Sequence, residues 1–264
     1  MGDFDPAREF FPVIRNRYGL KLFVKVVEPP EVQGNAYVAH GLSDVHDTVH
    51  MRALTAALVG AGYRVVLWDA THSWGRSEGS SERASFYHHF EDLEDVVAWS
   101  RSQAWYRERF VLAGHSLGGM AAGTYAASHA AQVAGLALVA PVVSGSALRR
   151  RIPWPLRVWW RWRGEVRAPG RGRTRYGWEL MRSGWSYNLL AVAHRLTMPV
   201  LIVAAGRDRL IPPRLVRRLY RALASEHKQV EVVPLARHSF DAEWEALWLR
   251  EVVGEWVRSL SGGT

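Results

Sequence analysis

The residue that most directly suggests chemistry is a serine in the stretch AGHSLGGM, residues 113–120. Ser116 has Gly114 two positions before it and Gly118 two positions after it. The stretch follows an apolar run typical of a buried strand and precedes a helical pattern, and a G-x-S-x-G turn in that setting raises the serine hydroxyl above the edge of a sheet. The amino terminus of the helix also favours developing negative charge. We interpret Ser116 as a candidate nucleophile, with a tight packing turn as the alternative.

A serine of this kind needs a base that removes its proton. His238, in LARHSF, directly follows the last predicted strand and should lie over the carboxyl edge of the sheet; a surface-loop histidine is the alternative. An acid must then hold the imidazole in the right tautomer. Asp208, in AAGRDRLIPP, follows the preceding predicted strand, whereas Asp241 is interpreted as a cap of the final helix. The order Ser116, Asp208, His238 predicts a catalytic triad.

Acyl transfer also needs amide donors where the carbonyl oxygen becomes an anion, and removing one such donor costs about 3–4 kcal/mol. Leu117, the residue after the serine, provides one backbone N–H group. VAHGLSD, at 38–44, follows an early buried strand; Gly41 permits an irregular turn there, and the Leu42 N–H can then point into the site. The alternative for this His-Gly pair is an ordinary turn at the end of a strand.

These groups can meet only if strands carry them to one edge. Apolar runs predict strands at 20–27, 35–40, 64–69, 109–114, 135–141, 199–206 and 229–235. Helical patterns lie at 48–61, 90–100, 120–130, 213–224 and 241–260. Buried strands that alternate with helices predict an α/β fold, with a mostly parallel central sheet and helices on both faces.

The alternation stops between Pro141 and about Arg195, in a segment rich in Pro, Gly and Trp that has no predicted buried strand. We expect a single unit in which residues 1–140 and 196–264 form the core. Residues 141–195 are then a helical cap, inserted between core strands and lying over one end of the sheet.

Within the expected cap, PLRVWWRWRGEV places Leu156, Trp159 and Trp160 on one helix face, with arginines around it. Three interpretations stay open. The helix could pack within the cap with its arginines solvated, form an apolar roof over a pocket for acyl or aromatic groups, or contact a lipid surface, as a basic amphipathic helix with Trp can.

The formal net charge of +9 is local, because ten arginines and one acid between Arg149 and Arg175 account for all of it. A nucleic-acid binder would more often carry basic residues on a recognised motif, and none is found, so no nucleic-acid partner is expected. The arginines could instead select an acidic substrate. With no apolar run long enough to span a bilayer and no signal-peptide pattern, we expect a cytoplasmic protein.

Taken together, these motifs resemble the α/β-hydrolase superfamily, and within it the serine-aminopeptidase-like (S33-type) branch of monoacylglycerol lipases, lysophospholipases and cinnamoyl or feruloyl esterases. The motifs are HGLSD (40–44), WDATHSWGRSEG (68–79), GHSLGG (114–119), GRDRLIPP (206–213) and RHSF (237–240). The resemblance implies an α/β-hydrolase fold. It also implies that Ser116 is the nucleophile, Asp208 the acid and His238 the base, and that the backbone amides of Leu42 and Leu117 form the oxyanion site. The loop at 69–77 departs from the family's D-x-x-G-H-G-x-S pattern, and His72 within it is interpreted as a packing residue.

The leading hypothesis is a serine carboxylic-ester hydrolase that forms an acyl-enzyme intermediate on a small-molecule ester, with no metal and no organic cofactor. The candidate substrate contacts are His40, Trp159 and Trp160. The same fold and triad also serve other reactions. Two alternatives therefore remain. One is a monoacylglycerol lipase, lysophospholipase or thioesterase that acts at lipid surfaces, and the other is a noncatalytic binding protein of the same fold. The acyl chain, the alcohol and the oligomeric state are not predicted.

Overall fold

The computed structural model describes residues 7–167 and 174–261. Its main sheet has the strand order β1-β3-β5-β4-β6-β7-β10-β11, and β2 pairs with β3 beside this path. The strands are β1 (Arg8–Phe10), β2 (Val13–Arg15), β3 (Lys21–Glu28), β4 (Gly34–Ala39), β5 (Tyr63–Trp68), β6 (Phe110–His115), β7 (Val133–Val139), β10 (Val200–Ala205) and β11 (Lys228–Val233).

Six neighbouring strands, from β5 to β11, run parallel, while β1, β2 and β3 pair antiparallel at one edge. The central strands are apolar along their whole length because both faces of the sheet are covered: every residue of β6 and of β10 is buried. The expected α/β fold with a mostly parallel sheet is confirmed. The short strands β1 and β2 were not predicted, since three-residue strands leave no clear period in the sequence.

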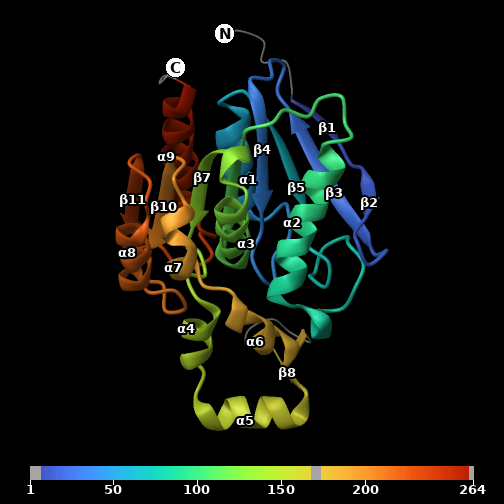
Figure 1. Ribbon diagram of the computed structural model, residues 1–264, viewed down its shortest axis with the longest axis vertical. Coiled ribbons are helices and arrows are strands. Elements are labelled where there is room, and N and C mark those ends of the chain that lie inside the picture. Colours follow the sequence, from blue (N-terminus) through green and yellow to red (C-terminus); the bar gives the residue numbers. More distant parts are fainter. Residues whose placement is uncertain (1–6, 168–173, 262–264) are drawn as a thin grey trace.

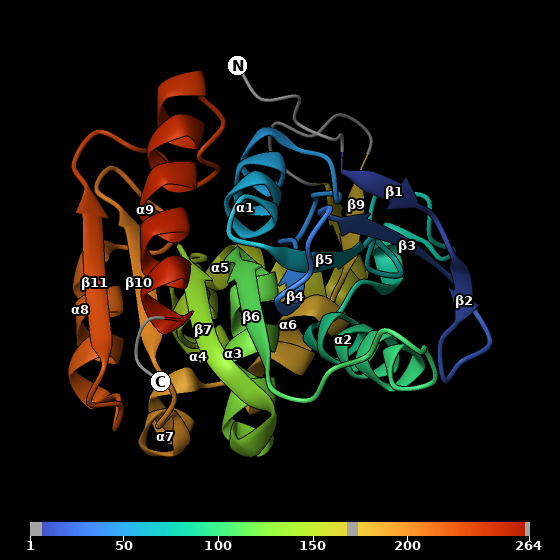
Figure 2. The ribbon, with the colours of Figure 1, turned by 90° about the horizontal axis from the view of Figure 1, so that it is seen from above.

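Helices cover both faces of the sheet (Figure 2). On one face α1 (Val49–Val59) packs beside α9 (Glu243–Ser261) over one apolar core. On the other face α2 (Phe86–Ser100), α3 (Ser116–Ser128) and α8 (Pro213–Ala222) cover a second core. The short 3-10 turns η1 (Ser81–Arg83) and η2 (Ala130–Gln132) join these elements.

Between β7 and β10 the chain leaves the sheet, and most of its described part lies beyond one end of the sheet before the last turns return beside α3 and α8 (Figure 1). Its elements are α4 (Gly145–Arg150), α5 (Trp154–Arg163), β8 (Glu165–Arg167), β9 (Arg175–Gly177), α6 (Glu179–Ser183), η3 (Gly184–Ser186), α7 (Leu189–Val192) and η4 (Ala193–Arg195). Most of these elements are helical, as expected, but β8 and β9 form a two-stranded antiparallel sheet that was not predicted. The limits 141–195 of a cap stay a prediction.

Some expectations fall on residues outside the described part of the chain. The expected core limits include 1–6 and 262–264, and the basic segment includes Arg171 and Arg173. Among the residues that the structure describes, no helix is both long enough and apolar enough to cross a membrane.

Candidate active site

The turn that carries Ser116 depends on glycines packed against backbone. Ser116 begins α3 directly after β6 and has a φ of 53°, in the left-handed region that is strained for a residue with a side chain. A Cβ at Gly118 would lie 2.2 Å from the carbonyl oxygen of Ala39, and a Cβ at Gly114 would lie 2.4 Å from that of Gly118. Only glycine lets α3 begin so close to the ends of β4 and β6, which explains the G-x-S-x-G spacing.

Three side chains from different strand ends meet above this turn. Nε2 of His238 lies 2.9 Å from Oγ of Ser116, and Nδ1 of His238 lies 2.6 Å from Oδ2 of Asp208. Asp208 follows β10 and His238 follows β11, and the parallel pairing of these strands brings their two loops to the same edge. The structure therefore brings together the three residues that the sequence grouped as a triad.

The carboxylate of Asp208 sets the tautomer of His238. The Asp208 side chain is fully buried, and its Oδ1 accepts the amides of Leu210 and Ile211 at 2.7 Å each. Because a carboxylate oxygen accepts hydrogen bonds, Nδ1 of His238 carries the ring proton, and Nε2 offers a lone pair to the hydroxyl of Ser116. Ser116 and His238 open onto a cavity of about 370 Å³.

The loop after β4 runs directly beside the serine. A Cβ at Gly41 would lie 3.0 Å from Cβ of Ser116 and 3.2 Å from Nδ1 of His115, so a larger residue would be crowded there. Leu42 follows this glycine, and Leu117 lies in the first turn of α3, where backbone N–H groups have no partner within the helix. Both amides thus lie in the segments that flank the serine, and their role as oxyanion donors stays a prediction.

The structure does not bring His40 into the cavity. Its side chain is 1% exposed, its Nδ1–H donates to the carbonyl of Gly41 at 2.7 Å, and its Nε2 accepts the amide of Ala70 at 2.8 Å. Both ring nitrogens are used within the protein, so no atom of the ring is left to bind a substrate. His40 instead ties the loop after β4 to the loop after β5.

The two candidate tryptophans of α5 have different surroundings. Trp160 is 5% exposed, donates its Nε1–H to the carbonyl of Tyr176 at 2.9 Å and packs edge-on against Trp178. Trp159 and Leu156 are exposed, so the face expected to be shared by the three residues is split. In the described part of the chain, neither tryptophan lines the cavity beside the candidate nucleophile.

The loop after β5 folds around a buried carboxylate. Asp69 accepts hydrogen bonds from the amides of His46 and Arg76 and from the His46 ring; burial raises the pKa of Asp69, but these bonds outweigh it and lower that pKa overall. His72 is buried with a φ of 61°, and its Nδ1 accepts the amide of Ser80 at 3.0 Å. Burial lowers the pKa of His72 to about 4, so the ring is neutral near pH 7. This geometry agrees with a packing role for His72.

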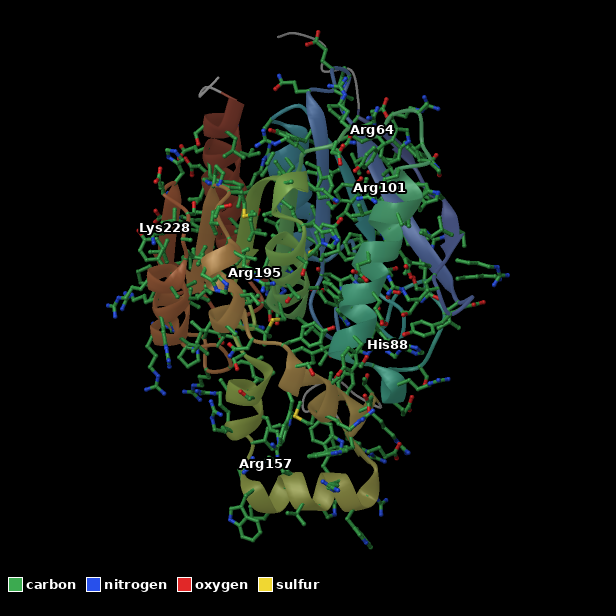
Figure 3. All side chains as sticks on the ribbon, in the orientation of Figure 1. Arg64, His88, Arg101, Arg157, Arg195 and Lys228 are labelled. Atoms are coloured by element: carbon green, nitrogen blue, oxygen red, sulfur yellow. The ribbon has the colours of Figure 1, made fainter. Side chains whose placement is uncertain are left out.

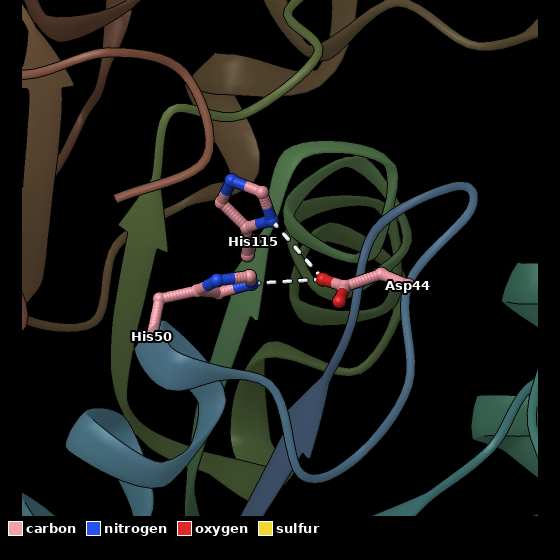
Figure 4. Close-up of side chains that lie close together, drawn as sticks. All are labelled: Asp44, His50 and His115. Carbon is pink, nitrogen blue, oxygen red and sulfur yellow. Dashed lines mark hydrogen bonds and ion pairs between the residues drawn. The ribbon is translucent and has the colours of Figure 1, made fainter. Parts of the chain in front are cut away.

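Two groups beside the triad were missed. Asp44, His50 and His115 form a buried cluster (Figure 4), and nothing in their separation along the chain signalled it, because the three come from a loop, a helix and a strand end. The second group is a set of exposed arginines that flank the acid and the base and line a cavity of about 870 Å³ with them. They are Arg207, Arg209 and Arg237. They are adjacent to the acid and the base in the sequence, in GRDR and ARH, and this adjacency is the signal by which they could be found.

The sheet, the turn around Ser116 and the loops that meet it define an α/β-hydrolase. The chain also matches the family described as serine aminopeptidase, S33, over residues 30–172 and 167–245. Since the match covers most of its length, the protein belongs to this family.

Comparison with solved structures supports the same fold. Est1E from Butyrivibrio proteoclasticus, with bound ferulic acid, is 19% identical, with a TM-score of 0.81 over 95% of this chain and 99% of that one. Mouse alpha/beta hydrolase domain-containing protein 10 is 15% identical, with a TM-score of 0.79 over 95% and 99%. A monoacylglycerol lipase from Paleococcus ferrophilus is 23% identical, with a TM-score of 0.73 over 90% and 99%. Among curated proteins no match was found.

Proposed function

We propose that the protein is a serine carboxylic-ester hydrolase. The observation that carries this proposal is the continuous hydrogen-bonded chain from Ser116 through His238 to Asp208. The Gly41 loop packed against the serine supports it, and so does the similarity in fold to an esterase domain from Rhodothermus marinus and to the monoacylglycerol lipase.

In the proposed reaction His238 takes the proton of Ser116 while Oγ attacks the acyl carbon. The amides of Leu42 and Leu117 donate to the oxygen that becomes negative. His238 then gives its proton to the departing alcohol, and later removes a proton from the water that releases the acid. Asp208 stabilises the imidazolium ion that forms in each step. No step in this sequence requires a metal or an organic cofactor.

The test is turnover of short-chain nitrophenyl esters together with covalent labelling by a fluorophosphonate. Ser116→Ala should lose on the order of 10⁶ in kcat and all labelling, because removal of the nucleophile stops the acyl transfer. Ser128→Ala changes an exposed serine at the other end of the same helix and should keep both. An unlabelled wild-type chain with no turnover would instead support a noncatalytic binding protein.

A second proposal, resting on the first, is that the ester is reached at an anionic lipid surface. Helix α5 lies at the outer end of the segment beyond the sheet (Figure 1), and side chains project from its outer side (Figure 3). Trp154, Val158 and Trp162 on this helix are 68%, 58% and 80% exposed. Large exposed apolar side chains gathered on one helix are typical of an interaction surface.

Charge favours a bilayer as the occupant of this surface. Arg161 and Arg163 are exposed on the same helix, and the segment around it carries the excess positive charge of the chain. Basic side chains are attracted to anionic headgroups while Trp and Val enter the interface. Because the proposed chemistry does not use α5 and the proposed docking does not use Ser116, Asp208 or His238, the two proposals can fail separately.

Co-sedimentation with vesicles tests the lipid proposal. The chain should bind phosphatidylserine vesicles, bind phosphatidylcholine vesicles weakly and detach at high salt. A Val158→Ser/Trp162→Ser variant should lose binding, whereas Trp244→Ser, at an exposed position of α9, should not. Equal binding of the two variants to the vesicles would contradict the proposal that α5 contacts a lipid surface. Self-association of the wild-type chain that the α5 variant abolishes would contradict it too.

A further inference from the structure

Beside the triad, three side chains from different elements converge on a buried point (Figure 4). Asp44 lies in the loop after β4, His50 in the first turn of α1 and His115 at the end of β6. Their side chains are buried, being at most 9% exposed. Nε2 of His50 lies 2.8 Å from Oδ2 of Asp44, and Nδ1 of His115 lies 3.6 Å from the same oxygen. One ligand atom from each residue lies within 4.8 Å of the other two.

The ring of His115 presents a lone pair to this point. Its Nε2 lies 2.8 Å from the carbonyl oxygen of His238, and since a carbonyl only accepts, Nε2 carries the ring proton. In the neutral ring Nδ1 is then an acceptor, and it has no hydrogen-bond partner among the described residues. A buried lone pair that faces a carboxylate oxygen is unfavourable in a site of low dielectric unless a cation or a proton lies between them.

We propose that Asp44, His50 and His115 bind a zinc ion. Two imidazole nitrogens and one carboxylate oxygen are ordinary Zn²⁺ ligands, and tetrahedral bonds of about 2.0–2.1 Å separate such ligand atoms by about 3.3 Å. The two separations from Oδ2 of Asp44, 2.8 and 3.6 Å, lie on either side of that value. A hydrogen bond explains the first separation, but the second is longer than a direct hydrogen bond.

The second nitrogen of each histidine ring also suits a metal site. On binding, His50 would give its Nε2 lone pair to the ion and carry its ring proton on Nδ1 instead. The hydrogen bond from Nε2 of His115 to the carbonyl of His238 then orients the ligand, as the partners of metal-bound histidines commonly do.

The ion would be reached from the cavity of about 370 Å³, which all three side chains line together with Ser116 and His238. A fourth coordination position could therefore hold water from that cavity. Zn²⁺ would join the loop after β4 to α1 and to the end of β6. Its role would be to hold the segment that carries Leu42 in place beside the nucleophile.

The test measures binding of Zn²⁺ alone to the full chain carrying Ser116→Ala, after dialysis against a chelator. Calorimetry should find one ion per chain, and Co²⁺ should give the visible absorption of a tetrahedral site. Asp44→Asn and His50→Gln, each made in the same background, should weaken binding by more than about 100-fold, since each removes a ligand. His227→Gln, at an exposed histidine, should leave binding unchanged.

Failure to bind, or binding that both cluster variants retain, would overturn the proposal. Nuclear magnetic resonance of the ring nitrogens gives an independent measurement: a His115 ring protonated at both nitrogens at neutral pH, and insensitive to Zn²⁺, would show that a proton lies between the groups instead. Asp44→Asn keeps the shape of the side chain, so it serves if His50→Gln does not fold. Because the nucleophile is absent from the tested chain, these results do not depend on ester hydrolysis.

Discussion

Three buried or half-buried imidazoles near the candidate active site differ in the partners of their ring nitrogens. His238 donates from Nδ1 to a carboxylate and leaves Nε2 facing Ser116. His40 has the same tautomer, but its Nε2 is already occupied by the amide of Ala70. His115 has the opposite tautomer, with the proton on Nε2. The partner of one nitrogen thus decides whether a ring can act as a base, a structural tie or a ligand.

At this scale the first prediction concerns Asp208. Asp208→Asn should lower kcat by about 10⁴, because an amide in place of the carboxylate favours the wrong tautomer of His238. The measurement is single-turnover and steady-state hydrolysis of a nitrophenyl ester. Asp241→Asn is the matched control, since Asp241 follows the same histidine but is exposed. A large loss of kcat in the Asp241 variant, with none in the Asp208 variant, would show that Asp241 and not Asp208 is the acid that orients His238.

Among the elements, the sequence predicted those that bury apolar residues on both faces. The runs that became β6 and β10 are continuous and lead directly into the loops that carry the site, so Ser116, Asp208 and His238 could be placed at one edge without coordinates. The pair β8–β9 could not be predicted, because only three residues in each strand pair and neither alternates clearly. For the same reason the contact between the hydroxyls of Ser43 and Tyr176, which joins the loop after β4 to β9, had no signal in the sequence.

The start of α3 gives the second prediction. Gly118→Ala should destabilise the fold by about 1–3 kcal/mol and sharply reduce turnover, since the new methyl group would clash with the backbone oxygens of Ala39 and His40 and move Ser116. Gly254→Ala in α9 meets only the flexible end of Arg258 and should stabilise the fold by up to about 1 kcal/mol. Urea denaturation measures the change in the free energy of unfolding, which should be of opposite sign in the two variants. A stable, active Gly118→Ala variant would contradict the packing described.

The third prediction concerns the contact of α2 with the loop after β5. Asp92 is buried and accepts hydrogen bonds from Asn16 and from the amide and hydroxyl of Thr71, and burial raises its pKa to about 7. The folded chain therefore keeps this proton to a higher pH than the unfolded chain does, and stability should fall as the pH rises from about 4 to about 7. The change should approach about 1.4 kcal/mol per pH unit within that window.

Asp92→Asn should remove that dependence, because the amide does not titrate. The difference in Tm between wild type and variant, followed by circular dichroism over this pH range, should shift in favour of the variant as the pH rises. Asp47→Asn, at an exposed aspartate, controls for the loss of a charge at the surface. Parallel Tm curves for wild type and Asp92→Asn would show that Asp92 stays ionised across the range.

For the whole molecule, the sequence located the charge but not its relation to the site. The arginines between Arg149 and Arg175 could be counted, and their segment could be expected over one end of the sheet. Only the fold shows that a different set, Arg207, Arg209 and Arg237, lines a cavity with the acid and the base. The cluster of Asp44, His50 and His115 could not be predicted for a related reason. Each residue alone has an ordinary explanation, and only the approach of three elements brings the three side chains together. What sequence patterns miss here are contacts between elements.

The arginines beside the acid and the base lead to the last prediction. Arg207, Arg209 and Arg237 line the cavity that contains Asp208 and His238. An ester with a free carboxylate on its acyl chain should therefore be drawn to the site, and its kcat/KM should fall as the ionic strength rises from about 0.01 to 0.5 M, where the screening length shrinks to a few ångströms.

The matched neutral substrate is the same ester with its free carboxylate converted to a methyl ester. The kcat/KM for this substrate should change little with salt. An Arg209→Gln/Arg237→Gln variant should flatten the salt dependence of the acidic ester while leaving the neutral ester unaffected, whereas Arg250→Gln on α9 should change neither. If the two substrates respond to salt alike in the wild type, Arg207, Arg209 and Arg237 do not attract the carboxylate of the substrate, and this prediction is wrong.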